Sequence, residues 1–232
     1  MPGSSDRDLL TAFIDRFINP IVWRLPGHDA WKLYSFALAE QSSLLDLLSA
    51  ARLTSSVERR ALYIRHGMDE ARHALIYSHR SAELRRSRGK DSYGSLHADY
   101  ENLFENMGEV KFLAFVHRGE QRGRRRFEGH RDFFGRRGDD RMRAMFEGVL
   151  QDERRHESYT RELLVELCGG EAKAKAELRR SAAWEAWRTW RRAGRFVAVN
   201  VYTLLMTVVY LALAPFSLLV RVLRPEAKGW SA

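Results

Sequence analysis

The stretch that decides the fold occurs twice in this chain, as Asp69-Glu70-Ala71-Arg72-His73 and as Asp152-Glu153-Arg154-Arg155-His156. Both copies lie in the long part of the sequence without proline, between Pro26 and Pro215, where helices can run without interruption. A Glu and a His three residues apart lie on the same face of an α-helix. Each copy therefore presents one carboxylate and one imidazole side by side.

Two further glutamates, Glu40 and Glu120, are flanked by apolar residues at helical spacing, as the two copies are. The spacing predicts four helices, near residues 28–53, 55–88, 108–134 and 139–167. Ser55 with Glu58 offers a cap for the second helix, and Gly169-Gly170 stops the fourth. The four apolar stripes are Leu33, Phe36, Glu40, Leu44 and Leu47; Tyr63, Gly67, Glu70, His73, Ala74 and Tyr77; Leu113, Val116, Glu120, Gly123 and Phe127; and Met142, Met145, Val149, Glu153, His156 and Thr160.

Four carboxylates on apolar helix faces predict a bound cation, because burying them uncompensated would carry a heavy desolvation cost. Fe(II) and Mn(II) prefer carboxylate oxygens with a few imidazoles, whereas zinc and copper sites favour sulfur or more nitrogen. Helix bundles hold two such ions with this donor set. We predict a centre of two iron ions, with manganese as an option; a bundle that has lost its metal is the alternative. The predicted ligands are Glu40, Glu70, His73, Glu120, Glu153 and His156.

These motifs resemble those of the ferritin-like di-iron carboxylate proteins, which include rubrerythrins, bacterioferritins, acyl carrier protein desaturases and bacterial multicomponent monooxygenases. The resemblance covers about residues 28 to 167, and by it the same six residues carry over as ligands. It implies an all-α fold, a ferritin-like four-helix bundle at 28–170 with a long crossover between the second and third helices. The Gly- and Ser-containing stretch 89–107 would form that crossover.

The Asp before each Glu and the Arg before each His resemble the oxygen-activating desaturases and monooxygenases in particular. The resemblance implies that Asp69 and Asp152 accept hydrogen bonds from imidazole N–H groups, and that Arg72 and Arg155 hold these carboxylates. An exposed Asp-Arg pair within one helix is the alternative, worth only about tenths of a kcal/mol.

The chain departs from rubrerythrins at two points. Their extra Glu on the third helix would fall at Gly123, and no rubredoxin module is possible because Cys168 is the only cysteine. Electrons must therefore come from a redox partner protein or a diffusible reductant. A single cysteine also excludes an internal disulfide framework.

The C-terminal third has a different composition. Residues 196–220 carry no charge, which predicts a transmembrane or membrane-embedded segment at 196–223, kinked at Pro215, and a short tail at 224–232. A re-entrant or in-plane segment and a buried soluble helix are the alternatives. The preceding stretch, 171–195, has the composition of an interfacial helix. Its anchoring residues are Trp184, Trp187, Trp190, Arg188, Arg191, Arg192 and Arg195.

The N-terminal residues 1–27 read as an amphipathic helix that packs on the bundle or lies on a membrane. No signal peptide is visible, and arginines are more numerous before the membrane segment than after it. Both features predict a bundle on the cytoplasmic side.

The net charge of +9 comes in part from the arginines that precede the membrane segment. No nucleic-acid motif accompanies this charge. The oligomeric state stays open, with a homodimer among the options.

The leading functional hypothesis is a membrane-anchored di-iron oxidoreductase that activates O2 to hydroxylate or desaturate a lipophilic substrate, such as a quinone, an acyl chain or an isoprenoid. Two ferrous ions can supply two electrons together, and a dry pocket directs the oxidant at the substrate. A ferroxidase or peroxide-reducing protein at the membrane is the second hypothesis, by resemblance to rubrerythrin and bacterioferritin. A metal-free membrane scaffold is the third.

Overall fold

The computed structural model of this chain describes residues 17–98 and 100–223. The chain forms two compact units, Met1–Ser181 and Ala182–Ala232. Within the described residues all regular structure is helical, which confirms the predicted all-α class. The α-helices are α2 (Asn19–Val22), α3 (His28–Leu53), α4 (Val57–Arg86), α5 (Leu103–Met107), α6 (Glu109–Arg136), α7 (Asp140–Cys168) and α8 (Glu171–Leu223).

Each of the four predicted helices begins and ends within two residues of its predicted bounds, as α3, α4, α6 and α7. Local capping explains the ends. The Ser56 hydroxyl accepts a hydrogen bond from the Arg59 N–H at 3.2 Å, so the predicted cap at Ser55 is wrong by one residue. Asp139 caps α7 by accepting from the Met142 N–H at 3.0 Å. Gly169 ends α7 in the left-handed region, with φ +67°.

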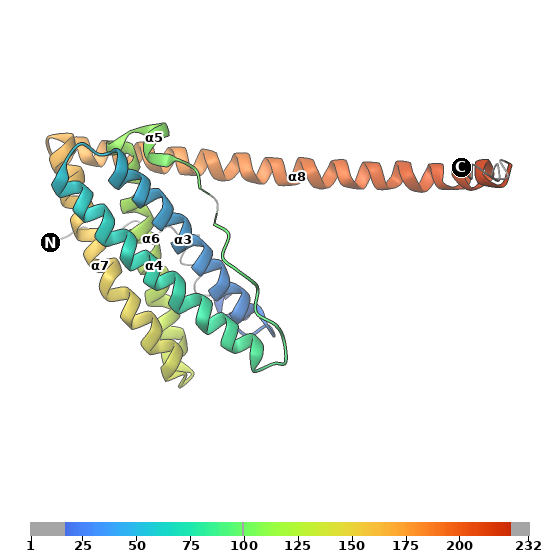
Figure 1. Cartoon of the computed structure of the whole chain (residues 1–232), viewed down its shortest axis with the longest axis horizontal. Coiled ribbons are helices and arrows are strands. Elements are labelled where there is room, and N and C mark those ends of the chain that lie inside the picture. The colour runs from blue at the N-terminus through green and yellow to red at the C-terminus, as the bar shows by residue number, and fades with distance from the viewer. Residues whose placement is uncertain (1–16, 99, 224–232) are drawn as a thin grey trace, which may run out of the picture. The chain divides into compact units, whose positions relative to one another are not determined.

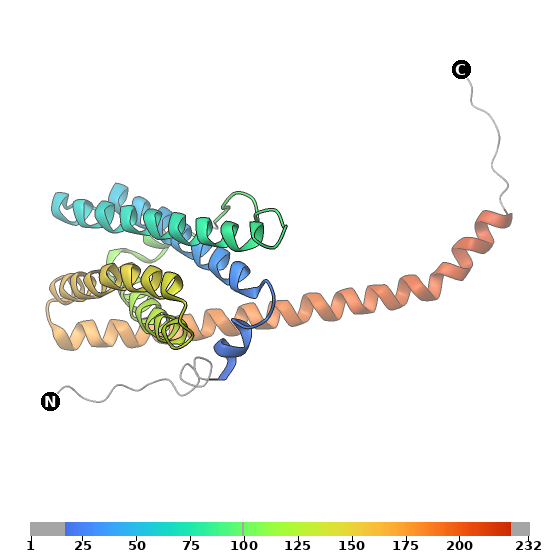
Figure 2. The same cartoon turned by 90° about the horizontal axis from the view of Figure 1, so that it is seen from below.

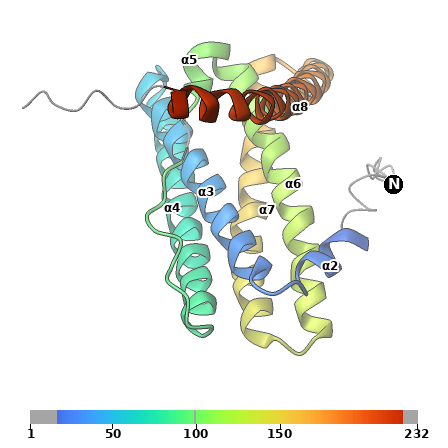
Figure 3. The same cartoon turned by 90° about the vertical axis from the view of Figure 1, so that its right-hand side faces the viewer.

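The four long helices form two pairs, α3 with α4 and α6 with α7. Short connections, 54–56 and 137–139, join the members of each pair and make them antiparallel. All four helices lie side by side in the first unit (Figure 1, Figure 3), and α4 contacts α7 across the two pairs.

A long connection, 87–108, carries the chain from the first pair to the second and includes α5. It runs beside α3, where the Tyr34 hydroxyl donates to the Ser95 carbonyl at 3.2 Å and Asp46 accepts from the Leu103 N–H at 3.3 Å. At its end, Glu109 accepts a hydrogen bond from Thr54 at 2.9 Å. The connection therefore returns the chain to the end at which α3 turns into α4.

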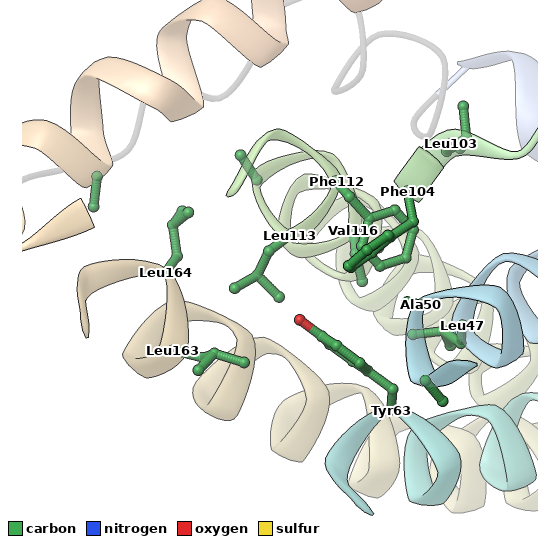
Figure 4. Packing of buried hydrophobic residues seen from close by; sticks show 13 residues of the cluster. Leu47, Ala50, Tyr63, Leu103, Phe104, Phe112, Leu113, Val116, Leu163 and Leu164 are labelled. Atoms are coloured by element: carbon green, nitrogen blue, oxygen red, sulfur yellow. The ribbon is translucent and has the colours of Figure 1, made fainter. Parts of the chain in front are cut away.

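Two apolar clusters fill the interior of the paired helices. The first gathers around Tyr63, with Leu47 of α3, Leu113 of α6 and Leu164 of α7 (Figure 4). The second lies toward the other end of the helices and is mainly aromatic; it includes Trp23, Phe36, Tyr77, Phe127 and Phe146. Each of α3, α4, α6 and α7 contributes to both clusters, so each of these four helices crosses the space between them once.

Most of the predicted N-terminal helix lies outside the described residues. In the part that is described, α2 is followed by Trp23, which is buried in the second cluster and donates its indole N–H to His130 Nδ1 at 3.2 Å. This contact attaches Trp23 to α6, whereas Phe17, Ile18 and Ile21 of the predicted helix are exposed.

Helix α8 continues through the second unit without a break in its helical assignment, although Pro215 lies inside it. The helix bends toward its C-terminal end (Figure 2). It is long and apolar enough to cross a membrane. All but one of its large apolar side chains between Phe196 and Phe216 are exposed, Leu204 by 66% and Leu211 by 69%, and Met206 is half-buried, as expected of a lipid-facing surface.

Candidate metal centre

A layer of carboxylates and imidazoles separates the two apolar clusters. On α3, Glu40 lies between Phe36 of the aromatic cluster and Leu47 of the first cluster. On α4, Glu70 lies between Tyr63 and Tyr77 in the same way. Glu120 of α6 and Glu153 of α7 occupy the corresponding positions. Each of the four glutamates therefore lies at the same position along its helix, between the two apolar clusters. All six predicted ligands are buried: Glu40, Glu70, His73, Glu120, Glu153 and His156.

Their ligand atoms form two groups, each with all its atoms within 4.8 Å of one another. One group contains Glu40, His73 and Glu153. The other contains Glu70, Glu120 and His156, together with a residue that the sequence did not single out, His66. The structure therefore brings together every predicted ligand and adds a third imidazole.

Distances within the groups suit ions placed between the donors. His156 Nδ1 lies 3.5 Å from both Glu70 Oε1 and Glu120 Oε2. His73 Nδ1 lies 3.8 Å from Glu153 Oε1 and 4.0 Å from Glu70 Oε1. These separations are too long for good hydrogen bonds, and they leave room for a cation that contacts both donors.

The two imidazoles provide a test of whether this site fits a metal. Among the described residues, Nδ1 of His73 and Nδ1 of His156 are buried polar atoms without a hydrogen-bond partner. A buried polar atom without a partner is costly. Both atoms point at carboxylate oxygens, so a cation bound to the lone pair of each nitrogen would satisfy them. The arrangement of these donor atoms fits a bound metal ion.

The opposite nitrogen of each ring is held from the neighbouring helix. His73 of α4 donates from Nε2 to Asp152 of α7 at 3.1 Å, and His156 of α7 donates from Nε2 to Asp69 of α4 at 3.1 Å. These bonds fix the tautomer in which Nδ1 carries the lone pair. The predicted partners of the imidazoles are therefore present, paired across α4 and α7.

Two arginines tie these carboxylates together. Arg155 donates to Asp69 and to Asp152, both at 2.7 Å. Arg72 donates to Asp69 at 2.9 Å and to Asp152 at 2.5 Å. Although partial burial opposes it, hydrogen bonds from the imidazoles and Arg155 lower the pKa of both aspartates. Both stay ionised at neutral pH and accept the imidazole protons.

Without a cation, three of the four glutamates are held in surroundings that disfavour their charged form, whereas, although burial opposes it, His66 and His156 lower the pKa of the fourth, Glu120. Burial, followed by the charges of neighbouring carboxylates, raises the pKa of Glu40 and of Glu153 well above its ordinary value. Burial likewise raises the pKa of Glu70. Such groups take up protons unless positive charge is supplied. A pair of divalent cations would supply it.

Gly123 gives the centre room on α6. A Cβ placed at this residue would lie 2.9 Å from Glu153 Oε2, closer than van der Waals contact allows. The absence of a side chain at residue 123 therefore leaves space for a carboxylate from α7. Any side chain at residue 123 would displace that oxygen.

His66 is the residue that sequence reasoning missed, since a lone histidine on a helix is usually structural. The signal available was its spacing: it precedes Glu70 by four residues and therefore shares its face. Tyr77 is also notable, because its hydroxyl is buried without a hydrogen-bond partner among the described residues. Its ring packs on Phe36 and Phe127, which line the aromatic side of the centre.

The predicted interfacial residues lie along α8. Trp184, Trp187 and Trp190 are exposed, and Arg188 lies over the Trp184 ring at 5.1 Å from its centroid. Exposed indoles with arginines are typical of helices at a lipid headgroup layer. The remaining predicted members of this segment are Arg191, Arg192 and Arg195, also exposed.

Comparison with known proteins identifies no relative. No significant match to this chain was found among protein families, curated proteins or solved structures. What this protein does must therefore be inferred from the site itself.

Proposed function

We propose that this protein is a membrane-anchored di-iron oxidoreductase of the ferritin-like kind, which activates O2 to hydroxylate or desaturate a lipophilic substrate. One observation carries the proposal: buried carboxylates and imidazoles from four helices gather into two adjacent groups of ligand atoms. The long connection beside α3 and the antiparallel helix pairs support a ferritin-like four-helix bundle with its crossover between α4 and α6.

Charge and donor chemistry support iron. The two groups contain four glutamates, whose charges two divalent cations would balance. Carboxylates with few imidazoles suit Fe(II) or Mn(II) better than zinc or copper. When bound, two ferrous ions supply the two electrons for reducing O2. The electrons must be replaced by an external donor, since the chain has one cysteine, Cys168.

The chain's own residues have three tasks in this proposal. Asp69 and Asp152 hold protons on the Nε2 atoms, so that both Nδ1 lone pairs face the centre. The aromatic cluster around Phe36, Phe127 and Phe146 excludes water from one side. The Tyr77 hydroxyl, which has no hydrogen-bond partner within residues 17–98 and 100–223, is available to donate a hydrogen bond to a group that enters the centre.

The membrane segment supports a lipophilic substrate. A span in α8 tethers the centre to a bilayer, where quinones, acyl chains and isoprenoids are concentrated. Such a substrate would partition from lipid and need not cross water.

The test uses the full-length protein in nanodiscs made from its host's lipids, loaded anaerobically with Fe(II). Reductant and ¹⁸O2 are then added, and the lipids are analysed by mass spectrometry. We expect one lipid species to gain ¹⁸O or to lose two hydrogens, and a Glu70→Ala, Glu153→Ala variant to produce neither. Oxidation of Fe(II) in large excess over the protein, with no altered lipid, would contradict the oxygenase proposal and indicate a ferroxidase.

A further inference from the structure

His66 contacts the candidate metal centre from α4. Its Nε2 atom lies 3.1 Å from Glu70 Oε1 and 3.4 Å from Glu120 Oε1. Its ring lies on that of His156, with the centroids 3.7 Å apart. His66 is 1% exposed. It therefore faces carboxylates from two different helices at the same level as His156.

The three buried imidazoles of the centre share one arrangement, in which one nitrogen faces the carboxylates and the other has a partner outside. For His73 and His156 the outer partner is an aspartate. For His66 it is Tyr159 of α7, whose hydroxyl lies 2.6 Å from Nδ1. A metal-bound imidazole keeps its proton on the nitrogen that does not bind the metal. Nδ1 of His66 is placed to carry that proton and donate it to the tyrosine oxygen.

We propose that His66 is a third imidazole ligand of the di-metal centre, binding through Nε2 at the group formed with Glu70, Glu120 and His156, and that Tyr159 is its positioning residue. This inference rests on the proposed di-metal function and deepens it. It makes the two metal positions unequal, because one has two nitrogen donors and the other, with Glu40, His73 and Glu153, has one.

The outer partners of the three imidazoles differ as well. The Tyr159 side chain is a phenol, which carries no charge at neutral pH. An ionised aspartate makes an imidazole a stronger donor than a phenol does. Nitrogen donors also shift the metal preference of a binding position from Mn(II) toward Fe(II) and Co(II). The position beside His66 should therefore be the more selective of the two against manganese.

The simpler interpretation is that His66 only forms an ion pair with Glu70 one helical turn away. That interpretation explains the Glu70 contact. It does not explain why His66 also approaches Glu120 on α6, or why its second nitrogen is held by a residue of α7. A ligand needs this fixed orientation, whereas an ion pair within one helix does not.

The test is ¹H NMR of the full-length protein in detergent, loaded with Co(II). Each imidazole bound to Co(II) gives one solvent-exchangeable N–H signal shifted far outside the normal range. We expect three such signals, from His66, His73 and His156. His66→Ala should remove one signal and weaken one of the two Co(II) binding events at least about tenfold. Tyr159→Phe should keep three signals, but the His66 signal should exchange faster with solvent.

His117→Ala is the matched control, since His117 is also buried but bonds to Thr160 at 3.0 Å and belongs to neither group. It should leave all three signals in place. Two bound Co(II) ions with only two shifted N–H signals, unchanged by His66→Ala, would overturn the inference and leave the di-metal centre intact. A protein that binds no Co(II) would overturn the proposed function and, with it, this inference. The signal count of the unsubstituted protein decides the question even if a variant fails to fold.

Discussion

At the scale of single residues, the proposed metal centre depends on positions that are not themselves among its ligands. Gly123 leaves space for the Glu153 carboxylate, and Asp69 and Asp152 orient the imidazoles from the neighbouring helix. Each of these effects can be separated from folding by a substitution that keeps the helix intact.

Gly123→Ala should weaken metal binding without destabilising the helix. Its Cβ would push away Glu153 Oε2, which lies 2.9 Å from that position, while alanine favours a helix over glycine by about 1 kcal/mol. We expect about a tenfold loss of Fe(II) affinity, measured by anaerobic titration. Gly129→Ala is the control, because nothing lies within 4 Å of a Cβ there. Equal affinities for the two variants would show that Glu153 does not need this space.

Asp152→Asn should lower metal affinity roughly 10–100-fold, the usual effect of removing a partner of a metal-binding histidine. The oxygen of the asparagine amide can still accept a hydrogen bond from His73 Nε2–H. It lacks the negative charge that strengthens this hydrogen bond. Asp132→Asn, which alters an exposed aspartate paired with Arg131, is the matched control. Titration calorimetry with Fe(II) measures both, and an unchanged affinity in Asp152→Asn would argue against the orienting role.

Sequence alone predicted six of the seven side chains that the two groups bring together, because each of the six lies at a fixed register in an apolar stripe. It did not predict His66, because Glu120 and Tyr159 approach this residue only once α6 and α7 are packed. For the same reason it did not predict that Asp69 and Asp152 each serve the imidazole of the opposite helix. These contacts depend on the relative position of helices, which spacing within one helix does not determine.

At the scale of elements, helix bounds were predictable because apolar periodicity and glycine stops agree. Which of Ser55 and Ser56 caps α4 was not predictable, since either serine can cap a helix. The backbone conformation at residue 56 makes Ser56 the cap. Helix α5 within the long connection was also missed. It is short, and its Leu103 and Phe104 are buried through tertiary packing, which local propensity does not reveal.

Helix α8 should anchor the protein in lipid. Leu205 and Val209 lie in its uncharged stretch and are exposed. An arginine at the centre of a span costs about 2.5–3.5 kcal/mol, so the double variant Leu205→Arg, Val209→Arg should move protein from the membrane pellet to the soluble fraction. The control is a double variant with Leu48→Arg and Leu75→Arg, which changes exposed residues of α3 and α4. This control protein should stay in the membrane pellet. A double variant of α8 that resists alkaline extraction as the native protein does would contradict a membrane span.

At the scale of the whole molecule, two apolar clusters enclose a charged layer, so stability should depend on pH and on metal. His130 lies in the aromatic cluster, where burial, then the charges of Lys32 and Arg126, lower its pKa well below the ordinary value. Below about pH 6.5 the unfolded state binds more protons than the folded state. The free energy of unfolding therefore decreases as the pH falls, because the unfolded state takes up a proton on His130 that the folded state does not.

His130→Gln should reduce this loss, because glutamine does not titrate. We expect the difference in unfolding free energy between pH 7.5 and pH 5.5, from urea titrations of the metal-free protein, to be smaller in the variant than in the native chain. The same difference in both proteins would show that His130 is not kept neutral by the fold.

The most direct test of the central claim is the metal content of the full-length protein, purified in detergent under anaerobic conditions and titrated with Fe(II), beside the Glu70→Ala, Glu153→Ala double variant. Two groups of buried ligands predict about two irons per chain, lost in the variant, with proton release on binding. Protein that takes up no Fe(II) and behaves as the variant does would contradict a di-iron centre and leave a helical membrane scaffold.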